Sequence, residues 1–311
     1  MKSGTSDVVD LSVIVVSYNT RELLRRCLRS ALAAAETDNV SVELVVIDNG
    51  SADGSAAAVR EEYPAATLLA FDQNLGFAAA SNVGLARANG RYPLLLNPDT
   101  EVRPGAFAAL VGFMDRHPKV AAVGPSLVYG DGSPQHSCFA FPTVAMQFLD
   151  LFPLHHRLLS SRLNGRYPLG RQEPFPIGHP LGACMLIRRE ALAQIGALDE
   201  GFFIYCEEVD WCWRAQKAGW QVYCQPRAVV VHHGAQSTRQ FAEKMFVELY
   251  RGRYRLMTRH YGRLRLAAAR TVILAGMAKL ALADRWAAAR GRLGKAELQA
   301  RLQAYTTIAR M

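Results

Sequence analysis

Fully apolar runs of strand length alternate with helix-like segments along the first part of this chain. The first run, Leu11–Ser17, is rich in Val and Ile, and in the following segment, Arg21–Ala35, apolar residues recur at spacings of three and four. Strands that are apolar throughout lie in sheets covered on both faces, and helices between such strands make them parallel. The alternation therefore predicts an α/β fold, a Rossmann-like and mostly parallel sheet with helices on both faces.

The same pattern resumes after an irregular middle stretch. We expect strands at 11–17, 42–47, 66–71, 92–96, 120–124, 184–188, 202–205, 220–224 and 228–231, and helices at 21–35, 56–62, 77–88, 104–116, 190–195 and 207–218. Residues 125–180 contain eight prolines and interrupt the rhythm. Long irregular stretches of this kind in compact enzymes are usually functional.

Composition limits the class of protein. A chain of 311 residues, 50% hydrophobic and 20% charged, can form one large α/β domain with an appendage, or two small domains. The six cysteines form no CxxC pair and no zinc-ribbon spacing, which favours a reduced cytosolic setting over a disulfide framework. The polar N-terminus predicts no export signal, and Leu11–Val16 is too short to span a bilayer.

Positive charge is concentrated near the C-terminus. From Arg239 to Met311 there are 16 Lys and Arg against 4 Asp and Glu, a balance of +12, and residues 1–238 carry 20 against 23, or −3, for a net charge of +9. A nucleic-acid-binding protein carries basic charge where its recognition motifs lie. Because the motif-rich part of this chain is slightly acidic, we expect no nucleic-acid partner.

The basic segment 239–311 has the pattern of amphipathic helices. Its apolar row consists of Val247, Tyr250, Tyr254, Met257, Tyr261 and Leu264, and its basic row of Arg251, Arg255, Arg259 and Arg263. This arrangement suits an anionic membrane surface, and packing against the rest of the chain is the alternative. A second segment, Leu266–Ala283, is apolar but contains Arg270 and Lys279, so we expect that it does not span a bilayer.

Polar residues follow each of the first four expected strands, at 17–19, 48–51, 72–74 and 97–99. Turns and helix caps use the same residue types. The carboxyl ends of parallel strands, however, meet at one edge of a sheet, where the ligands of such sheets bind. Four such loops together predict a binding site at this edge.

Six motifs, in this order and spacing, resemble family 2 glycosyltransferases, and most closely the bacterial rhamnosyltransferases that build cell-wall or surface polysaccharide. The motifs are VIVVSYN at Val13–Asn19, VVIDNGSADGS at Val45–Ser55, NLGFAAASNVG at Asn74–Gly84, LLLNPDT at Leu94–Thr100, GACMLIRREAL at Gly182–Leu192 and GFFIYCEEVDWCWR at Gly201–Arg214. The resemblance covers about residues 11–238. It implies a GT-A catalytic domain at 1–238, with a donor-binding half at about 11–125 and an acceptor and catalytic half at about 126–238, followed by the helical extension 239–311.

The resemblance further implies an inverting transfer from a nucleotide-diphosphate-sugar donor with a divalent cation, Mg²⁺ or Mn²⁺. The implied donor-binding residues are Ser17, Tyr18, Asn19, Asp48, Asn74, Gly76, Asn82, Asn97, Asp99, Gly182 and Ala183. A carboxylate such as Asp48 can accept a hydrogen bond from the imide N–H of uracil or thymine, which fits a UDP or dTDP donor. We expect residues 131–180 to cover the acceptor, a glycan or a polyprenyl-diphosphate-linked sugar.

By the same resemblance, Asp99 matches the last acidic position of a DxD-type metal motif, in which a carboxylate and donor phosphate oxygens hold the cation. Asn97 replaces the first carboxylate of that motif, so the site keeps one strong anionic ligand. His232, after an apolar strand, matches the position of a further metal ligand, and the adjacent His233 is the alternative.

The general base of an inverting transfer takes the proton of the attacking acceptor hydroxyl. By resemblance this role belongs to Glu208, with Glu207 and Asp210 as alternatives, and the non-catalytic interpretation is an acidic first turn that complements the helix dipole. Arg214 is a candidate to offset charge on the departing diphosphate or to pair with Asp210.

The leading hypothesis is therefore an inverting sugar transferase, with dTDP-rhamnose as donor, at the inner face of the cytoplasmic membrane. A nucleotidyltransferase and a catalytically inactive nucleotide-sugar-binding protein are the alternatives.

Overall fold

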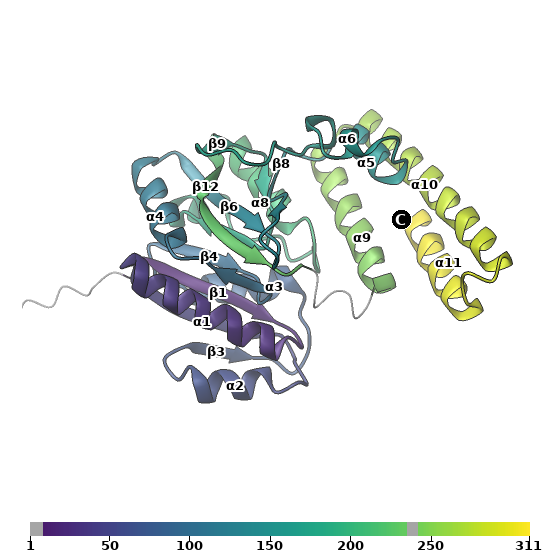
Figure 1. Cartoon of the computed structure of the whole chain (residues 1–311). Coiled ribbons are helices and arrows are strands. Elements are labelled where there is room, and N and C mark those ends of the chain that lie inside the picture. Colours follow the sequence, from purple (N-terminus) through teal and green to yellow (C-terminus); the bar gives the residue numbers. More distant parts are fainter. Residues whose placement is uncertain (1–8, 235–241) are drawn as a thin grey trace, which may run out of the picture.

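The computed structural model describes residues 9–234 and 242–311. The expected domain boundary at 238/239 lies outside the described residues. Ten of the described strands form one sheet in the order β3-β2-β1-β4-β11-β6-β12-β5, with β7 beside β6 and β9 beside β12, and a second sheet pairs β10 with β8 (Figure 1). Neighbours among β3, β2, β1 and β4 are parallel, as are β6 and β12, whereas β11 runs antiparallel to both β4 and β6. The predicted mostly parallel α/β sheet is confirmed.

The strands are β1 Leu11–Ser17, β2 Val42–Asp48, β3 Thr67–Ala70, β4 Tyr92–Leu96, β5 Thr100–Val102, β6 Val120–Val128, β7 Pro134–Gln135, β8 Cys138–Phe139, β9 Phe175–Pro176, β10 His179–Pro180, β11 Cys184–Ile187 and β12 Gln221–His232. The helices are α1 Arg21–Asp38, α2 Ser55–Glu62, α3 Phe77–Arg87, α4 Ala106–Arg116, α5 Val144–Leu151, α6 His156–Leu159, α7 Arg189–Ile195, α8 Glu207–Lys217, α9 Ala242–His260, α10 Arg263–Ala289 and α11 Lys295–Ala309, with a 3₁₀ turn at Arg162–Asn164.

Helices cover both faces of the sheet, as the apolar strands require. All seven residues of β1 are buried, and successive side chains enter different cores. On one face, Val13 and Val15 pack in a core that includes residues of α1 and α4. On the other face, Ile14 and Val16 pack in a core that includes residues of α3, α7 and α8. A strand with two buried faces explains why the sequence shows a continuous apolar run rather than an alternation.

One edge of the sheet collects the carboxyl ends of several strands. Ser17 at the end of β1 pairs with Asp48 at the end of β2, and β4 ends beside them. The first residue of the antiparallel β11, Cys184, pairs with the last residue of β4, Leu96. The end of β12 joins this edge because His232 pairs with Thr100 of β5. The topology therefore brings loops from five strands to one place.

Two expected elements differ from the structure. Residues 202–205 form bends rather than a strand, because Tyr205 and Cys206 take left-handed backbone angles, with φ of 71° at both, as the chain turns into α8. The strands expected at 220–224 and 228–231 are one strand, β12, whose pairing with β6 is irregular between Gln225 and Val229. All six cysteines are free thiols in the structure.

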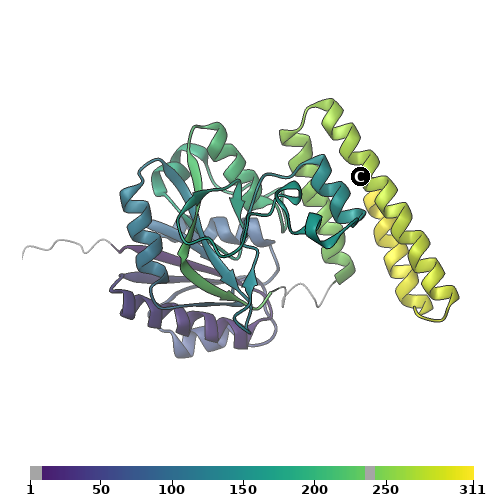
Figure 2. The same cartoon turned by 45° about the horizontal axis from the view of Figure 1, so that its top comes forward.

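The C-terminal helices form a layer beside the sheet. Figures 1 and 2 place α9 next to the part of the chain that forms the sheet, with α10 and α11 on its far side. The predicted apolar row of α9 is buried in part, since Tyr250, Tyr254 and Met257 share a core with residues of α10 and α11. Leu151 of α5 belongs to the same core. The basic extension is therefore a folded helical layer that also includes part of the proline-rich middle stretch.

Among the described helices, α10 is the one whose length and apolar composition would suffice to cross a membrane. Of its most apolar window, 22% is buried inside the structure. The expectation that this segment does not span a bilayer stays a prediction, because length and composition alone do not decide it. Core helices of soluble proteins share these two properties, so they do not by themselves place α10 in a bilayer.

Candidate active site

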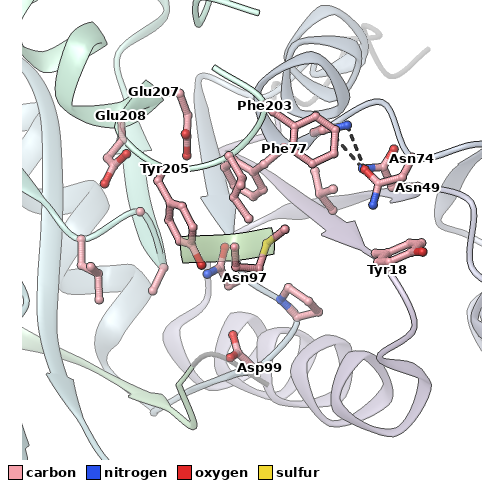
Figure 3. Close-up of a pocket in the computed structure, with 18 of the residues that line it drawn as sticks. Tyr18, Asn49, Asn74, Phe77, Asn97, Asp99, Phe203, Tyr205, Glu207 and Glu208 are labelled. Atoms are coloured by element: carbon pink, nitrogen blue, oxygen red, sulfur yellow. Dashed lines mark hydrogen bonds between the residues drawn. The ribbon is translucent and has the colours of Figure 1, made fainter. Parts of the chain in front are cut away.

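A pocket of about 550 Å³ lies at the edge of the sheet where the strand ends meet (Figure 3). Its walls come from the loops after β1, β2 and β4, the segments before β11 and α8, the end of β12 and the start of α9. Seven of the eleven predicted donor-binding residues line it: Tyr18, Asn74, Gly76, Asn97, Asp99, Gly182 and Ala183. The candidate acids Glu207 and Glu208 line the same pocket, so these predicted donor-binding and catalytic residues lie together.

Two asparagine side chains hold the loops on one side of the pocket. Asn49 Nδ2 donates to Asn74 Oδ1 at 3.0 Å, and Asn49 Oδ1 accepts from the backbone N–H of Leu75 at 2.9 Å (Figure 3). Asn74 Oδ1 also accepts from the N–H of Gly76 at 2.9 Å. Gly76 has φ +86°, and a Cβ there would lie 2.6 Å from the Phe203 carbonyl oxygen, so no larger residue fits without a shift.

Asp99 and His232 form the polar group on another side. His232 Nε2 lies 3.5 Å from Asp99 Oδ1, and its Nδ1 lies 3.1 Å from Gln135 Oε1. The Gln135 oxygen can accept from an Nδ1–H of the ring, and Nε2 is the nitrogen that faces Asp99. His233 points elsewhere, with its Nε2 2.8 Å from Glu101 Oε1. Of the two histidines, His232 is therefore the one that lines the pocket with Asp99.

The acidic pair at the start of α8 is buried. Burial raises the pKa of Glu208 to about 7, an effect that the backbone N–H groups of Glu208, Val209 and Gly182 partly offset. The pKa of Glu207 is raised well above its ordinary value by burial and then by the neighbouring charge of Glu208. One oxygen of each carboxyl has no hydrogen-bond partner among the described residues. Figure 3 shows the pair on one side of the pocket and Asp99 on another, with Tyr205 and Asn97 between them.

Asp210, the third candidate base, lies outside the pocket. It is fully buried, and its Oδ2 accepts from Arg214 Nε at 2.8 Å while its Oδ1 lies 2.8 Å from His260 Nε2 and 3.1 Å from Arg259 Nε. Arg214 also donates to the carbonyl oxygens of Ile195 and Ala197, both at 2.8 Å. Asp210 and Arg214 therefore form an ion pair within the fold, which was the alternative expectation for Arg214.

Comparison with known proteins identifies the family. Residues 12–196 match the family described as glycosyl transferase family 2. The N-acetylglucosaminyl-diphospho-decaprenol L-rhamnosyltransferase of Mycobacterium tuberculosis is 34% identical over 243 residues, which cover 73% of this chain and 77% of that protein. The chain belongs to glycosyl transferase family 2. A more distant relative, the O-antigen biosynthesis protein RfbC of Myxococcus xanthus, is 26% identical over 74% of this chain and 18% of its own length.

Solved structures confirm the GT-A fold of this glycosyltransferase. The mannosyltransferase PcManGT from Pyrobaculum calidifontis, solved with GDP-Man and Mn²⁺, matches with a TM-score of 0.58 and 19% identity over 99% of this chain and 90% of that chain. GalNAc-T7, solved with UDP, GalNAc and Mn²⁺, matches with a TM-score of 0.54 and 18% identity over 73% of this chain and 44% of that chain. Within the described residues of this glycosyltransferase, no group of three or more His, Cys, Asp and Glu side chains gathers as a ready metal site.

Four predicted donor-binding residues do not line the pocket of the family 2 enzyme. Ser17 Oγ lies 2.9 Å from Thr20 Oγ1, and Asn19 Oδ1 accepts from the N–H of Ala52 at 2.8 Å, so both hold the loops behind the pocket. Asp48 is buried beside it and accepts from the Ser51 N–H at 3.2 Å. Asn82 bonds the backbone of Leu198 through both its donor and its acceptor and therefore fixes α3 to the loop after α7.

Several pocket residues of this glycosyltransferase were not predicted. They are Val16, Asn49, Phe77, Pro98, Leu181, Phe203, Ile204, Tyr205, Lys244 and Met245. Asn49 follows Asp48 directly, and its place in a strand-end loop was the available signal. Lys244 and Met245 belong to α9, so the C-terminal extension contributes to the pocket wall. No local pattern marks these two residues, because their position depends on how α9 packs.

Proposed function

We propose that this glycosyltransferase moves a hexose, with inversion at the anomeric carbon, from a nucleotide-diphosphate donor to a glycan carried on a polyprenyl diphosphate. The proposed donor is dTDP-rhamnose, with UDP-sugars as the alternative. The name of the mycobacterial relative, a rhamnosyltransferase acting on a decaprenol-linked sugar, supports rhamnose as the transferred sugar and a polyprenyl-linked acceptor. The observation that carries the proposal is the single pocket that Glu208 and Asp99 line together.

The nucleotide is proposed to bind between the loops after β1, β2 and β3. Asp48 Oδ1 is buried and has no hydrogen-bond partner among the described residues, which supports a role toward the imide N–H of thymine or uracil. Tyr18, Asn74 and the close-packed Gly76 line the neighbouring wall. In this proposal Ser17 and Asn19 shape the loop and do not contact the donor.

A divalent cation, Mg²⁺ or Mn²⁺, fits the pair Asp99 and His232. The Asp99 carboxylate and His232 Nε2 lie 3.5 Å apart, and Gln135 orients the imidazole as the outer partners of metal-binding histidines do. Asn97 adds a neutral oxygen to the same wall. Two protein ligands leave positions for donor phosphate oxygens, and a bound cation would offset negative charge on the leaving diphosphate.

Glu208 is proposed as the general base. In its ionised form the carboxylate takes the proton of the acceptor hydroxyl while that oxygen bonds to the anomeric carbon and the bond from this carbon to the diphosphate oxygen breaks. A pKa of about 7 suits this role, since a base is most effective near the working pH. Burial and the charge of Glu208 raise the pKa of Glu207, so an ionised Glu208 favours the protonated form of Glu207.

The test of the proposed function is sugar transfer with purified protein. Thermal unfolding with dTDP-rhamnose, UDP-glucose and GDP-mannose, each with and without Mg²⁺ or Mn²⁺, should show the largest rise in Tm for the dTDP donor with a cation. Incubation with a polyprenyl-diphosphate-linked N-acetylglucosamine should then release dTDP and yield a rhamnosylated lipid. If no donor is consumed with any acceptor, the proposal of sugar transfer to a lipid-linked glycan is wrong.

We further propose peripheral attachment at the cytoplasmic face of the membrane, through α10. Two of the four arginines that suggested α9 for this role, Arg255 and Arg259, form ion pairs with Asp199 and Asp210. One exposed stripe along α10 contains no charged residue. It consists of Leu264, Ala268, Thr271, Ala275, Ala278, Leu282 and Trp286. Exposed cations flank it on both sides: Arg265, Lys279 and Arg290, and Arg263, Arg270 and Arg285. An apolar stripe between basic rows is typical of helices that lie in an anionic lipid surface.

The double substitution Leu282→Ser with Trp286→Ser should weaken co-sedimentation with phosphatidylglycerol vesicles at least tenfold. These side chains are 65% and 56% exposed, so their loss removes apolar contact with lipid and leaves the core intact. The matched control is Leu32→Ser, a partly exposed leucine of α1, which should bind as the unmodified chain does. Equal binding of the double variant and the control would contradict attachment through α10.

A further inference from the structure

The backbone immediately before α8 is strained. Tyr205 and Cys206 both have φ of 71°, a left-handed backbone conformation that residues other than glycine rarely adopt. These two residues precede Glu207 and Glu208, so their conformation sets where the acidic pair lies. Strained residues of this kind persist only when their surroundings hold them in place.

Helix α9 of the C-terminal extension supplies that support. Gly252 of α9 lies under this segment, and a Cβ at this position would be 2.7 Å from the Tyr205 carbonyl oxygen and 3.6 Å from Cys206 Sγ. One turn further along α9, Leu256 is buried with Phe202 and Val209, which lie on either side of the strained residues. The close approach of the two backbones therefore depends on the absence of a side chain at position 252.

The C-terminal end of α9 also holds the first turn of α8. His260 Nε2 and Arg259 Nε lie 2.8 Å and 3.1 Å from Asp210 Oδ1, and Asp210 is fully buried. Lys217 Nζ lies 3.1 Å from His260 Nδ1 and can only donate, so the neutral ring carries its proton on Nε2 and donates it to Asp210. His260 also stacks on Trp213 of α8, with 4.5 Å between the ring centroids.

A third contact ties α9 to the loop between α7 and α8. Arg255 Nε and Nη2 both bond Asp199, at 3.0 Å and 2.8 Å, and Arg259 Nη1 bonds the same carboxylate. Asp199 lies three residues before Phe202, at the start of the segment that leads to the pocket. Paired, bidentate contacts of this type fix orientation as well as distance.

We propose that α9 positions the acidic pair of α8 for catalysis, with Gly252 and His260 as positioning residues. The C-terminal extension then serves the chemical step and is more than an attachment to a membrane. The inference rests on the proposed role of Glu208, since it explains how that carboxyl is held at the pocket wall.

The first test is Gly252→Ala in the full chain, with Gly112→Ala as the matched control. Both glycines lie inside helices, but at position 112 a Cβ would meet only the end of the Arg116 side chain. With dTDP-rhamnose and a polyprenyl-diphosphate-linked N-acetylglucosamine, Gly252→Ala should lower kcat at least tenfold and change the donor KM less than twofold. Gly112→Ala should change neither. A Gly252→Ala variant with unchanged kcat would overturn the proposal.

Hydrogen exchange provides a readout that does not depend on turnover. The amides of residues 203–208 should exchange at least tenfold faster in Gly252→Ala than in Gly112→Ala, because the support under Tyr205 is displaced. Unchanged exchange in this segment would count against the positioning role, whichever donor the enzyme uses.

Variants of His260 keep the proposal testable if Gly252→Ala fails to fold. His260→Ala removes the donor to Asp210 and should lower kcat at least tenfold with the donor KM unchanged, whereas His260→Gln keeps an Nε2 donor and should restore most of the rate. Equal rates in both variants, whether high or low, would contradict the role of this hydrogen bond. The two proposals can fail separately. If Glu208 is not the base, Glu208→Gln remains active. The positioning role of α9 is then judged by hydrogen exchange, which does not depend on the base.

Discussion

Replacing Glu208 with Gln is expected to lower the rate of sugar transfer by about two to four orders of magnitude, the usual contribution of a general base. The amide has the size of the carboxyl group but cannot accept the proton of the acceptor hydroxyl. Donor binding depends on Asp48, Asp99 and the loop asparagines in our proposal, so the affinity for dTDP should stay within about twofold of its value in the unmodified enzyme. Single-turnover kinetics and dTDP titration measure the two effects separately.

The matched control for this substitution is Glu207→Gln, an identical change at the adjacent buried carboxyl. Because an ionised Glu208 favours the protonated form of Glu207, a neutral amide at position 207 should retain most of the activity. If Glu207→Gln is inactive and Glu208→Gln is active, the base is Glu207. If both variants keep full activity, neither carboxyl is the base.

The pKa of Glu208 also gives the enzyme a predicted pH profile. The base acts in its ionised form, so kcat should rise with pH through about 7 and level off above it. The residual activity of Glu208→Gln should lack this rise. A carboxyl of this pKa titrates between roughly pH 5.5 and 8.5. If kcat of the unmodified enzyme does not change over this range, the assignment of Glu208 as the base is wrong.

Stability should change in the opposite direction. A buried Glu whose pKa is raised from 4.5 to about 7 binds its proton more tightly in the folded state, so its favourable contribution is complete below pH 4.5 and is lost as pH rises through about 7. At about 1.4 kcal/mol per tenfold change in proton affinity, this group lowers the free energy of unfolding at pH 8 by on the order of 3 kcal/mol relative to its value below pH 4.5. Glu208→Gln should therefore have a higher free energy of unfolding than the unmodified protein at pH 8, with the difference shrinking toward pH 4.5 in denaturant titrations.

Replacing Asp99 with Asn is expected to have the second large effect, a loss of at least about a hundredfold in sugar transfer, since charge stabilisation by a bound cation contributes several kcal/mol. Asp99 is the one carboxylate beside His232 in the pocket wall, because Asn97 occupies the first acidic position of the motif. An amide at position 99 would leave the site without an anionic ligand. Calorimetry should show that Mn²⁺ tightens dTDP binding to the unmodified protein and no longer does so for the variant.

Glu101→Gln is the control for this prediction. Glu101 lies two residues away and bonds His233 rather than His232, and it does not line the pocket. Its amide variant should keep both the Mn²⁺ dependence of dTDP binding and the transfer rate. If Asp99→Asn behaves like Glu101→Gln in both measurements, the cation does not bind at Asp99.

Local sequence patterns were sufficient for most of the sheet and for the convergence of the strand-end loops. The apolar run Leu11–Ser17 is a strand because its residues are buried on both faces, and parallel strands with helical crossovers necessarily bring their carboxyl ends together. The polar residues after β1, β2 and β4 therefore had to meet. For Glu207 and Glu208 this reason does not hold, because no strand directly precedes α8, and it was the family resemblance that grouped them with Asp99.

Only the tertiary structure decided that Asp210 and His233 lie outside the pocket. Helical geometry separates positions 208 and 210 by about 200° around α8, so the two carboxyls face different surroundings, but which surroundings depends on how α8 packs. In the structure, α9 covers the side of Asp210, and the pocket opens on the side of Glu208. The choice between His232 and His233 likewise depends on the pairing of β12 with β5, and the entry of Lys244 into the pocket depends on the docking of α9. Each of these contacts joins residues far apart in the chain, and such contacts arise from packing, which leaves no local pattern in the sequence.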